Sequence, residues 1–291
     1  MISPKERDDM SHQQTSPFMV AQDLSAVSTL SMGVSVPILS AFGQPLAILP
    51  TSLLSTQTEE FGTPAKIELS DFLPRALQHW QEQQIQISGA LTGYLGSNRI
   101  IDQLAEVITR HPRNLIVVDP VMGDQGSLYP QLPSDYPEHM RKFIRAADVI
   151  VPNLTEAQFL TGLSTNQINT VDQILPLLNA LQKLLKPQAH AVITGIVLSN
   201  KVGCAWINDN GQVQFVGRPI LSGHFYGSGD VFASLLTGYL LNEEPLPQAI
   251  RLATSRTFIA LQETSQSDIP RKFGIRLTKL INDIASYTSR D

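Results

Sequence analysis

The sequence predicts an α/β fold in which helices cover both faces of a mostly parallel central sheet. Two patterns lead to this prediction. Short apolar runs alternate with longer segments of helical period, and several of the short runs are β-branched and end in Asp, Pro, Gly or Asn. The chain has 291 residues, 42% of them hydrophobic and 16% charged, so it can bury one sizeable core. Residues 1–17 are rich in Ser, Gln, Asp and Pro, which predicts a flexible tail before one domain over residues 18–291.

The individual elements follow in order along the chain. Strands are expected in the short apolar runs Phe18–Ala21, Leu46–Leu49, Ile85–Gly89, Leu115–Val118, Val149–Val151 and Ala191–Thr194. Helices are expected in the segments of helical period Leu30–Ala41, Ser70–Gln83, Ser97–Thr109, Tyr136–Ala146, Thr155–Leu163, Val171–Leu185, Asp230–Leu241, Pro247–Leu261 and Ile275–Tyr287. Cys204–Ile207 and Val213–Val216 flank an Asn-Gly turn signal and are expected to form an antiparallel hairpin, which makes the sheet mixed.

Composition argues against several classes of partner. Lys and Arg total 21 against 26 Asp and Glu and form no basic cluster, so the electrostatic footprint of a nucleic-acid-binding protein is missing. The single cysteine, Cys204, lies in an alternating run, which favours a buried strand position over a reactive thiol. No apolar stretch approaches the roughly 20 residues that cross a bilayer, and residues 1–17 lack the apolar region of a signal peptide. We therefore expect a cytoplasmic protein without nucleic-acid or membrane partners.

The segment Gly227-Ser228-Gly229-Asp230 stands directly before an apolar run of helical period and is the strongest local motif. Its two glycines let the backbone bend so that successive amides point outward, and the dipole of the following helix adds partial positive charge. The segment is therefore expected to bind an anion such as a phosphate. Asp230 would then accept a proton from an attacking hydroxyl. The structural alternative is that Asp230 is only a favourable carboxylate in the first helical turn.

Further polar residues follow predicted strands, at the edge of an open sheet where ligands bind. Asp119 and Asp124 come after one strand, where carboxylates can hold hydrated magnesium, although Asp-Pro and Gly-Asp are also common in turns. Asn153 and Glu156 come after the next strand. Glu156 could lie near magnesium through water, and the pair also fits a helix cap with its capping-box glutamate. Thr194 ends a third strand and could border a nucleotide.

These motifs together resemble the ribokinase superfamily and, within it, the pyridoxal kinase family. The likeness covers nearly the whole chain from Phe18 onward, and the joint order of the motifs is far more specific than any one of them. The segments that carry it are Asp23-Leu24-Ser25, Leu54-Ser55-Thr56-Gln57-Thr58, Thr92-Gly93-Tyr94-Leu95-Gly96, Asp119-Pro120-Val121-Met122-Gly123-Asp124, Pro152-Asn153-Leu154-Thr155-Glu156 and Gly227-Ser228-Gly229-Asp230. The resemblance implies a ribokinase-like three-layer α/β/α sandwich.

The resemblance also implies roles for individual residues. It makes Asp230 the catalytic base, with Gly227 and Gly229 in the anion hole. The positions it implies around the nucleotide are Asp119, Asn153, Thr194 and Ser228, and those around magnesium are Asp124 and Glu156. The positions it implies for the pyridine ring and its substituents are Ser25, Thr58 and Tyr94. Tyr94 equally suits a core aromatic residue.

The implied reaction is transfer of the γ-phosphoryl group of ATP to the 5-hydroxymethyl group of pyridoxal, pyridoxine or pyridoxamine. The resemblance further implies magnesium and a homodimer, and it leaves open a dependence on a monovalent cation. One alternative is a hydroxymethylpyrimidine kinase of thiamine synthesis, although that family commonly has Cys where this chain has Asp230. A second alternative is a catalytically silent protein that binds pyridoxal without turning over ATP.

Two segments depart from the family pattern and motivate the silent alternative. Relatives usually carry glycine where this chain has Ala26 and Ser28, which restricts positive φ angles. Relatives also often carry His-Thr-Gly-Gly where this chain has Gln57-Thr58-Glu59-Glu60. Two carboxylates near the mouth of a substrate site would disfavour an anionic ligand. The exact substrate is therefore left open, whereas the intact Gly227–Asp230 segment argues for catalysis.

Overall fold

The computed structural model describes residues 16–109, 115–165 and 168–289. The strands of its main sheet are β1 (Phe18–Ser25), β2 (Leu46–Leu54), β3 (Lys66–Glu68), β4 (Gly89–Thr92), β5 (Leu115–Val118), β8 (Val149–Ile150), β9 (His190–Leu198), β10 (Lys201–Ile207) and β11 (Val213–Pro219). A separate small hairpin consists of β6 (Gly123–Asp124) and β7 (Ser127–Leu128). The α-helices are α2 (Met32–Ala41), α3 (Phe72–Glu82), α4 (Asn98–Thr109), α5 (Tyr136–Phe143), α6 (Leu154–Thr161), α7 (Leu175–Gln182), α8 (Ser228–Leu241), α9 (Leu246–Ser265) and α10 (Thr278–Thr288).

The main sheet is mostly parallel and has the strand order β11-β10-β9-β8-β5-β4-β1-β2-β3. Strand β1 pairs in parallel with both β2 and β4, and the parallel pairing continues through β5 and β8 to β9. The two edges are antiparallel, with β3 on β2 at one side and the β10–β11 hairpin on β9 at the other. The chain runs from β1 outward to β2 and then returns to β4 on the other side. This reversal creates a crevice beyond the carboxyl ends of the strands, where ligands bind in such sheets.

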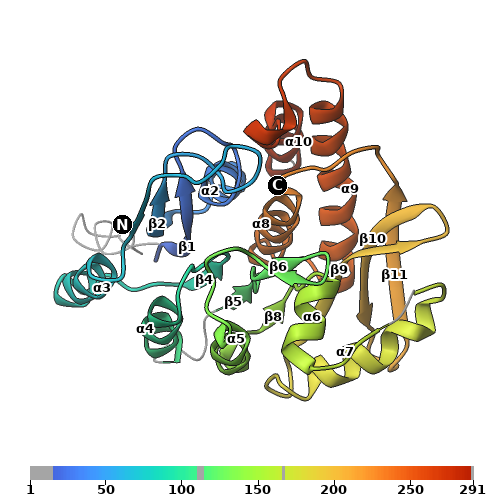
Figure 1. Ribbon diagram of the computed structural model, residues 1–291, viewed down its shortest axis with the longest axis horizontal. Helices are drawn as coiled ribbons and strands as arrows, with labels where there is room; N and C mark the ends of the chain where they lie inside the picture. The colour runs from blue at the N-terminus through green and yellow to red at the C-terminus, as the bar shows by residue number, and fades with distance from the viewer. Residues whose placement is uncertain (1–15, 110–114, 166–167, 290–291) are drawn as a thin grey trace, which may run out of the picture.

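Helices cover both faces of the sheet, as Figure 1 shows, and each face has its own hydrophobic core. Side chains alternate along β1, so Met19 and Ala21 join the core under α3 to α7, whereas Phe18 and Val20 join the core under α2, α8, α9 and α10. Each large apolar side chain buried in this way contributes roughly 1.5–3 kcal/mol. The predicted three-layer α/β/α sandwich is therefore confirmed. No helix in the described ranges is both long and apolar enough to cross a membrane.

Most predicted elements are present, and the clearest error is the strand expected at Ile85–Gly89. The strand is β4 instead, because Phe18 of β1 pairs with Gly89 and the ladder runs on to Thr92. A Cβ atom on Gly89 would lie 2.4 Å from the Leu115 carbonyl oxygen, so glycine allows the neighbouring strands to approach. Ile85 is 36% exposed and lies in the connection that precedes the strand. The prediction from the apolar run therefore placed this strand about four residues too early in the chain.

Other differences are smaller. The helix expected at Val171–Leu185 divides into a 3₁₀ turn, η2 (Val171–Ile174), and α7, with Pro176 in the first turn of α7. Proline has no N–H to continue the hydrogen-bond ladder, so the change of helix type there is expected. Short 3₁₀ turns also form at η1 (Ile144–Ala146) and η3 (Arg271–Phe273). The predicted tail, residues 1–17, lies outside the described residues as far as residue 15.

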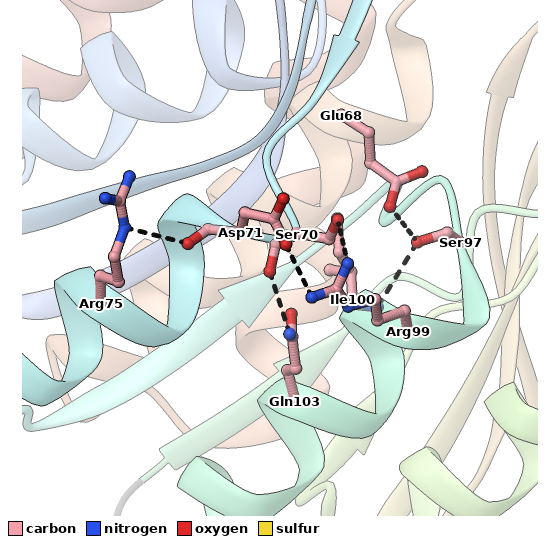
Figure 2. A network of polar contacts seen from close by, with 8 residues as sticks. All are labelled: Glu68, Ser70, Asp71, Arg75, Ser97, Arg99, Ile100 and Gln103. Carbon is pink, nitrogen blue, oxygen red and sulfur yellow. Dashed lines mark hydrogen bonds and ion pairs between the residues drawn. The ribbon is translucent and has the colours of Figure 1, made fainter.

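A polar network anchors the connection between β4 and α4, as Figure 2 shows. The Ser97 hydroxyl donates to Glu68 Oε1 of β3 at 3.0 Å, and Arg99 forms an ion pair of 2.7 Å with Asp71 before α3. Both partners of the ion pair are mostly exposed, and such pairs contribute only about 0–1 kcal/mol. The network therefore matters chiefly for position, because it fixes the loop that carries Tyr94 against the sheet edge.

Candidate active site

A cavity of about 400 Å³ lies at the carboxyl ends of the parallel strands, where the chain reverses direction between β2 and β4. It is lined by every residue that the sequence singled out for the site: Ser25, Thr58, Tyr94, Asp119, Asp124, Asn153, Glu156, Thr194, Gly227, Ser228, Gly229 and Asp230. These residues come from distant parts of the chain and meet only in the folded protein. Their individual roles remain predictions.

Gly227 forms the turn that opens α8. Its φ of 89° lies in the left-handed region, and an added Cβ atom would lie 3.0 Å from Leu30 Cβ, so both backbone conformation and space favour glycine. Gly229 differs, because it lies within the first turn of α8 and a Cβ atom there would make an ordinary 3.7 Å contact with Asp119 Oδ2. The bend expected from two glycines therefore depends on Gly227. The first N–H groups of a helix lack partners within it, so this end of α8 can receive an anion.

Asp230 lines the cavity and lies in the first turn of α8. Its Oδ2 accepts a hydrogen bond of 2.7 Å from the backbone N–H of Ser31. The cavity gives solvent partial access, yet protein atoms surround the group, and this burial raises the pKa of Asp230 to about 7. The Ser31 bond opposes the rise, whereas the nearby Asp23 carboxylate adds to it. A general base is most effective with a pKa near the working pH, which Asp230 has.

Asp119 and Glu156 are two further buried carboxyl groups of the cavity lining. Burial, followed by the charges of Glu156 and Asp230, raises the pKa of Asp119 well above its ordinary value. Burial also raises the pKa of Glu156, against the effect of its hydrogen bonds with backbone amides. Glu156 accepts from the N–H groups of Met122 at 3.1 Å and Asn153 at 2.8 Å. Asn153 Oδ1 in turn accepts from the Glu156 N–H, so the predicted capping box is confirmed.

The β6–β7 hairpin carries Asp124 to the cavity wall. The Asn153 amide donates to the Gly123 carbonyl at 2.8 Å, and the Gly126 N–H donates to the Thr155 hydroxyl at 3.0 Å. These bonds attach the hairpin to the start of α6, so the Asp124 carboxylate has a fixed place at the cavity. Its Oδ1 accepts from the Gln125 N–H, and the residue lines the cavity.

The end of the cavity next to β1 and β4 is lined by Ser25 and Tyr94. The Ser25 hydroxyl is buried and has no hydrogen-bond partner among the described residues. Tyr94 is half-buried, and its backbone carbonyl accepts from the Thr51 hydroxyl at 3.0 Å. Burial, then the charges of Asp23 and Glu68, raise the pKa of Tyr94 to about 12, so its phenol stays a neutral donor. An aromatic face and an unpaired hydroxyl suit a flat ring with polar substituents.

A segment over residues 55–65, which we call the strap, contributes Gln57, Thr58 and Glu59 to the cavity lining. The Tyr226 hydroxyl donates to Glu60 Oε1 of the strap at 2.8 Å. The Phe61 and Phe273 rings meet edge to face with centroids 5.3 Å apart. The strap also brings Glu59 to the cavity, where burial raises its pKa, the nearby His224 lowers it and Asp124 raises it. The two glutamates that depart from the family pattern thus have defined positions, one latching the strap and one facing the site.

Comparison with known proteins places this geometry in a family. A crystal structure of pyridoxal kinase from Lactobacillus plantarum shares 39% sequence identity and a TM-score of 0.88, covering 94% of this chain and 98% of that one. A crystal structure described as that of a putative phosphomethylpyrimidine kinase from Bacteroides thetaiotaomicron, in an orthorhombic form with pyridoxal, shares 31% identity and a TM-score of 0.84, covering 92% and 96% of the two chains. Residues 53–272 match the sequence model of the family described as phosphomethylpyrimidine kinase. The chain belongs to the phosphomethylpyrimidine and pyridoxal kinase family.

This membership confirms the family resemblance drawn from the motifs. The pyridoxal kinase of Arabidopsis thaliana is 31% identical over 189 residues, which cover 60% of this chain and 58% of that protein. The alignments with curated pyridoxal kinases span less than two thirds of each relative's length. The Lactobacillus plantarum structure, by contrast, matches over nearly its whole length, so the kinase fold itself is shared throughout.

Several cavity residues of this kinase-family protein were not assigned from the sequence. They include Asp23 near the end of β1, Tyr129 after β7, Arg218 of β11, and Thr257 and Phe258 of α9. Asp23 had a signal, since it lies near the carboxyl end of the first predicted strand. The two α9 residues had none, because the packing of α9 against α8, α10, β10 and β11 brings that helix to the cavity.

The family implies magnesium, and the carboxyl groups of the cavity allow a test of the fit. In the described part of the chain no His, Cys, Asp or Glu residues form a group of three or more that could hold a metal alone. Magnesium usually takes only one or two protein carboxylates together with substrate phosphates. Asp124 lines the cavity, and its Oδ1 accepts from the Gln125 N–H. The donor set therefore fits a magnesium ion that a nucleotide helps to hold.

Proposed function

We propose that this protein transfers the γ-phosphoryl group of ATP to the 5-hydroxymethyl group of pyridoxal, pyridoxine or pyridoxamine. The observation that carries the proposal is the Asp230 carboxyl, which lies beside Gly227 at the start of α8 and has a pKa of about 7. A hydroxyl that loses its proton to Asp230 would face a phosphate bound by the amides of the same helix start. The 39% identity with the Lactobacillus plantarum pyridoxal kinase supports the same reaction.

The cavity divides naturally between two substrates. The nucleotide would occupy the part lined from β8 to β10 and α9, where Val202 and Phe258 offer apolar surface to a purine base. The polar residues proposed to hold it are Asp119, Asn153, Thr194 and Ser228. The acceptor alcohol would lie at the other end, and the residues proposed to hold its ring are Ser25, Thr58 and Tyr94.

Magnesium would be held by Asp124, with Glu156 acting through water because its oxygens already accept backbone N–H groups. When bound, the ion would neutralise part of the triphosphate charge. A homodimer is a further proposal that rests on the family resemblance, and a cytoplasmic location is one that rests on the sequence pattern. Light scattering coupled to gel filtration tests the dimer, and replacing potassium by sodium in the assay tests a monovalent-cation requirement.

Hydroxymethylpyrimidine is the alternative acceptor, and the description of the matched family favours it. The deciding experiment is a coupled assay of ADP formation with each B6 vitamer, with hydroxymethylpyrimidine and with no acceptor. The proposal predicts ADP formation that depends on a B6 vitamer. Turnover with the pyrimidine alone, or pyridoxal binding without ADP formation, would contradict it. The second outcome would identify a silent binder, for which Glu59 and Glu60 of the strap are the natural cause.

A further inference from the structure

Asp23 is a buried carboxyl group of the cavity to which the proposed reaction gives no role. It lies two residues before the end of β1, lines the cavity and is 3% exposed. Its Oδ1 has no hydrogen-bond partner among the described residues. Leaving a buried acceptor unpaired is costly, and more so for a charged group. A ligand that brings a hydrogen-bond donor to this oxygen would therefore gain affinity.

Ser31 holds Asp23 next to the proposed base. Its backbone N–H donates to Asp230 Oδ2 at 2.7 Å, and its side chain hydrogen-bonds to Asp23. Ser31 has φ 45° and ψ −122°, a backbone conformation that is costly for any residue other than glycine. Such strain persists only where surrounding contacts enforce it, often at ligand sites. The two carboxyl groups are thus fixed side by side, and a group bound to Asp23 lies next to the hydroxyl that faces Asp230.

The charge around this end of the cavity favours a cation. The Asp23 carboxylate raises the pKa of Asp230 by repulsion. The cavity lining contains four further carboxyl groups, those of Glu59, Asp119, Asp124 and Glu156. The nearest basic side chain with an effect on Asp23 is Lys66, whose ammonium lies 5.9 Å from the centre of the Tyr94 ring. Lys66 is not part of the cavity lining and exerts the smallest of the effects on Asp23.

The B6 vitamers differ only at the ring carbon beside the one that carries the reacting hydroxymethyl group. Pyridoxamine has an aminomethyl group there, which is cationic at neutral pH, whereas pyridoxal has a formyl group with no N–H or O–H to donate. Charge-assisted hydrogen bonds are roughly twice as strong as neutral ones. Building on the proposed function, we infer that Asp23 binds the 4-aminomethyl group of pyridoxamine, so that this site prefers the amine vitamer to the aldehyde.

The test compares wild-type protein, Asp23→Asn and the control Asp209→Asn, whose residue is exposed in the β10–β11 turn. For each protein, kcat and KM are measured with pyridoxamine and with pyridoxal, and the dissociation constants of both are measured without ATP. Wild type and the control should favour pyridoxamine by about tenfold or more in kcat/KM. Asp23→Asn should lower kcat/KM for pyridoxamine by about 10–100-fold, mostly through KM, because a hydrogen bond to a charged group contributes about 1.5–3 kcal/mol. Pyridoxal should change by less than about threefold.

Equal losses with both vitamers, or a wild-type preference for pyridoxal, would overturn the inference. Melting temperatures establish that the variants fold, and Asp23→Ser, which keeps a small polar side chain, replaces Asp23→Asn if that variant does not. The result also separates this inference from the proposed function. Turnover of both vitamers without a pyridoxamine preference leaves the function standing and refutes the role of Asp23. Pyridoxamine binding that depends on Asp23, without any turnover, would support the role of Asp23 and refute the proposed function.

Discussion

The Asp230 carboxyl allows a stability test that needs no substrate. In the unfolded chain its pKa is the ordinary 3.8, and in the folded protein burial raises it to about 7. Between these values the folded state binds the proton more tightly than the unfolded state does. The stabilisation that this proton provides is complete below about pH 4 and is lost as the pH rises through about 7. Wild-type protein at pH 8 therefore carries a buried charge that opposes folding.

Asp230→Asn removes this titration while keeping the shape and an oxygen for the Ser31 N–H. The shift from 3.8 to about 7, at about 1.4 kcal/mol per pH unit, sets a ceiling of about 4 kcal/mol on the gain in the free energy of unfolding at pH 8. Only part of the Asp230 titration lies above pH 5.5. The gain of Asp230→Asn in the free energy of unfolding should therefore grow by up to about 2 kcal/mol between pH 5.5 and pH 8. This ceiling already includes relief of the repulsion with Asp23, which is one cause of the shift.

The assay is the melting temperature of both proteins at pH 5.5 and pH 8 without ligands. One kcal/mol corresponds to about 2–4 °C in a chain of this size class, so the advantage of the variant should widen by about 2–8 °C at the higher pH. An advantage that stays the same at both pH values, or wild-type protein that melts above the variant at pH 8, would refute the reasoning. The latter result is what a purely structural first-turn carboxylate predicts.

Other predictions follow from the geometry. A truncation that begins at Ser16 should keep both melting temperature and activity, because the tail composition cannot build a core; a large loss in either would show that it docks. Asp124→Asn should raise the magnesium concentration needed for half-maximal rate, and unchanged metal dependence in both Asp124→Asn and Glu156→Gln would contradict the magnesium assignment. Gly227→Ala should lower the melting temperature, because Gly227 has a φ of 89° and an added Cβ atom would lie 3.0 Å from Leu30 Cβ. Gly229→Ala should keep the wild-type melting temperature, and thermal melts of the two variants test both expectations.

The sequence predicted those features that depend on local pattern. Parallel strands with continuous apolar runs, such as Leu115–Val118, were found at their expected places because burial on both faces leaves a strong signal. The capping box of Asn153 and Glu156 was also predictable, since it needs only residues three apart. Because strand ends converge at one edge of the sheet, the predicted site residues were also brought together.

Features set by tertiary contact could not be predicted. Strand β4 consists of Gly89, Ala90, Leu91 and Thr92, whose small residues give a weaker strand signal than Ile85 and Ile87 before them. Strands β3, β6 and β7 have three residues or fewer, too short for any periodicity. The hydrogen bonding of the Asp23 carboxyl, with one oxygen unpaired, is set by the position that Ser31 takes after folding. Such positions emerge only when distant segments meet.

The central claim is that Asp230 is the catalytic base, and the turnover of Asp230→Asn with ATP and its best vitamer tests it most directly. General-base catalysis contributes about 10²–10⁴-fold to a rate, whereas a first-turn carboxylate contributes only about 0.3–1 kcal/mol to stability. We therefore expect kcat to fall by about 10²–10⁴-fold in a variant that folds as well as wild type does. Near wild-type kcat combined with a lowered melting temperature would show that the carboxylate is structural and that the mechanism is wrong.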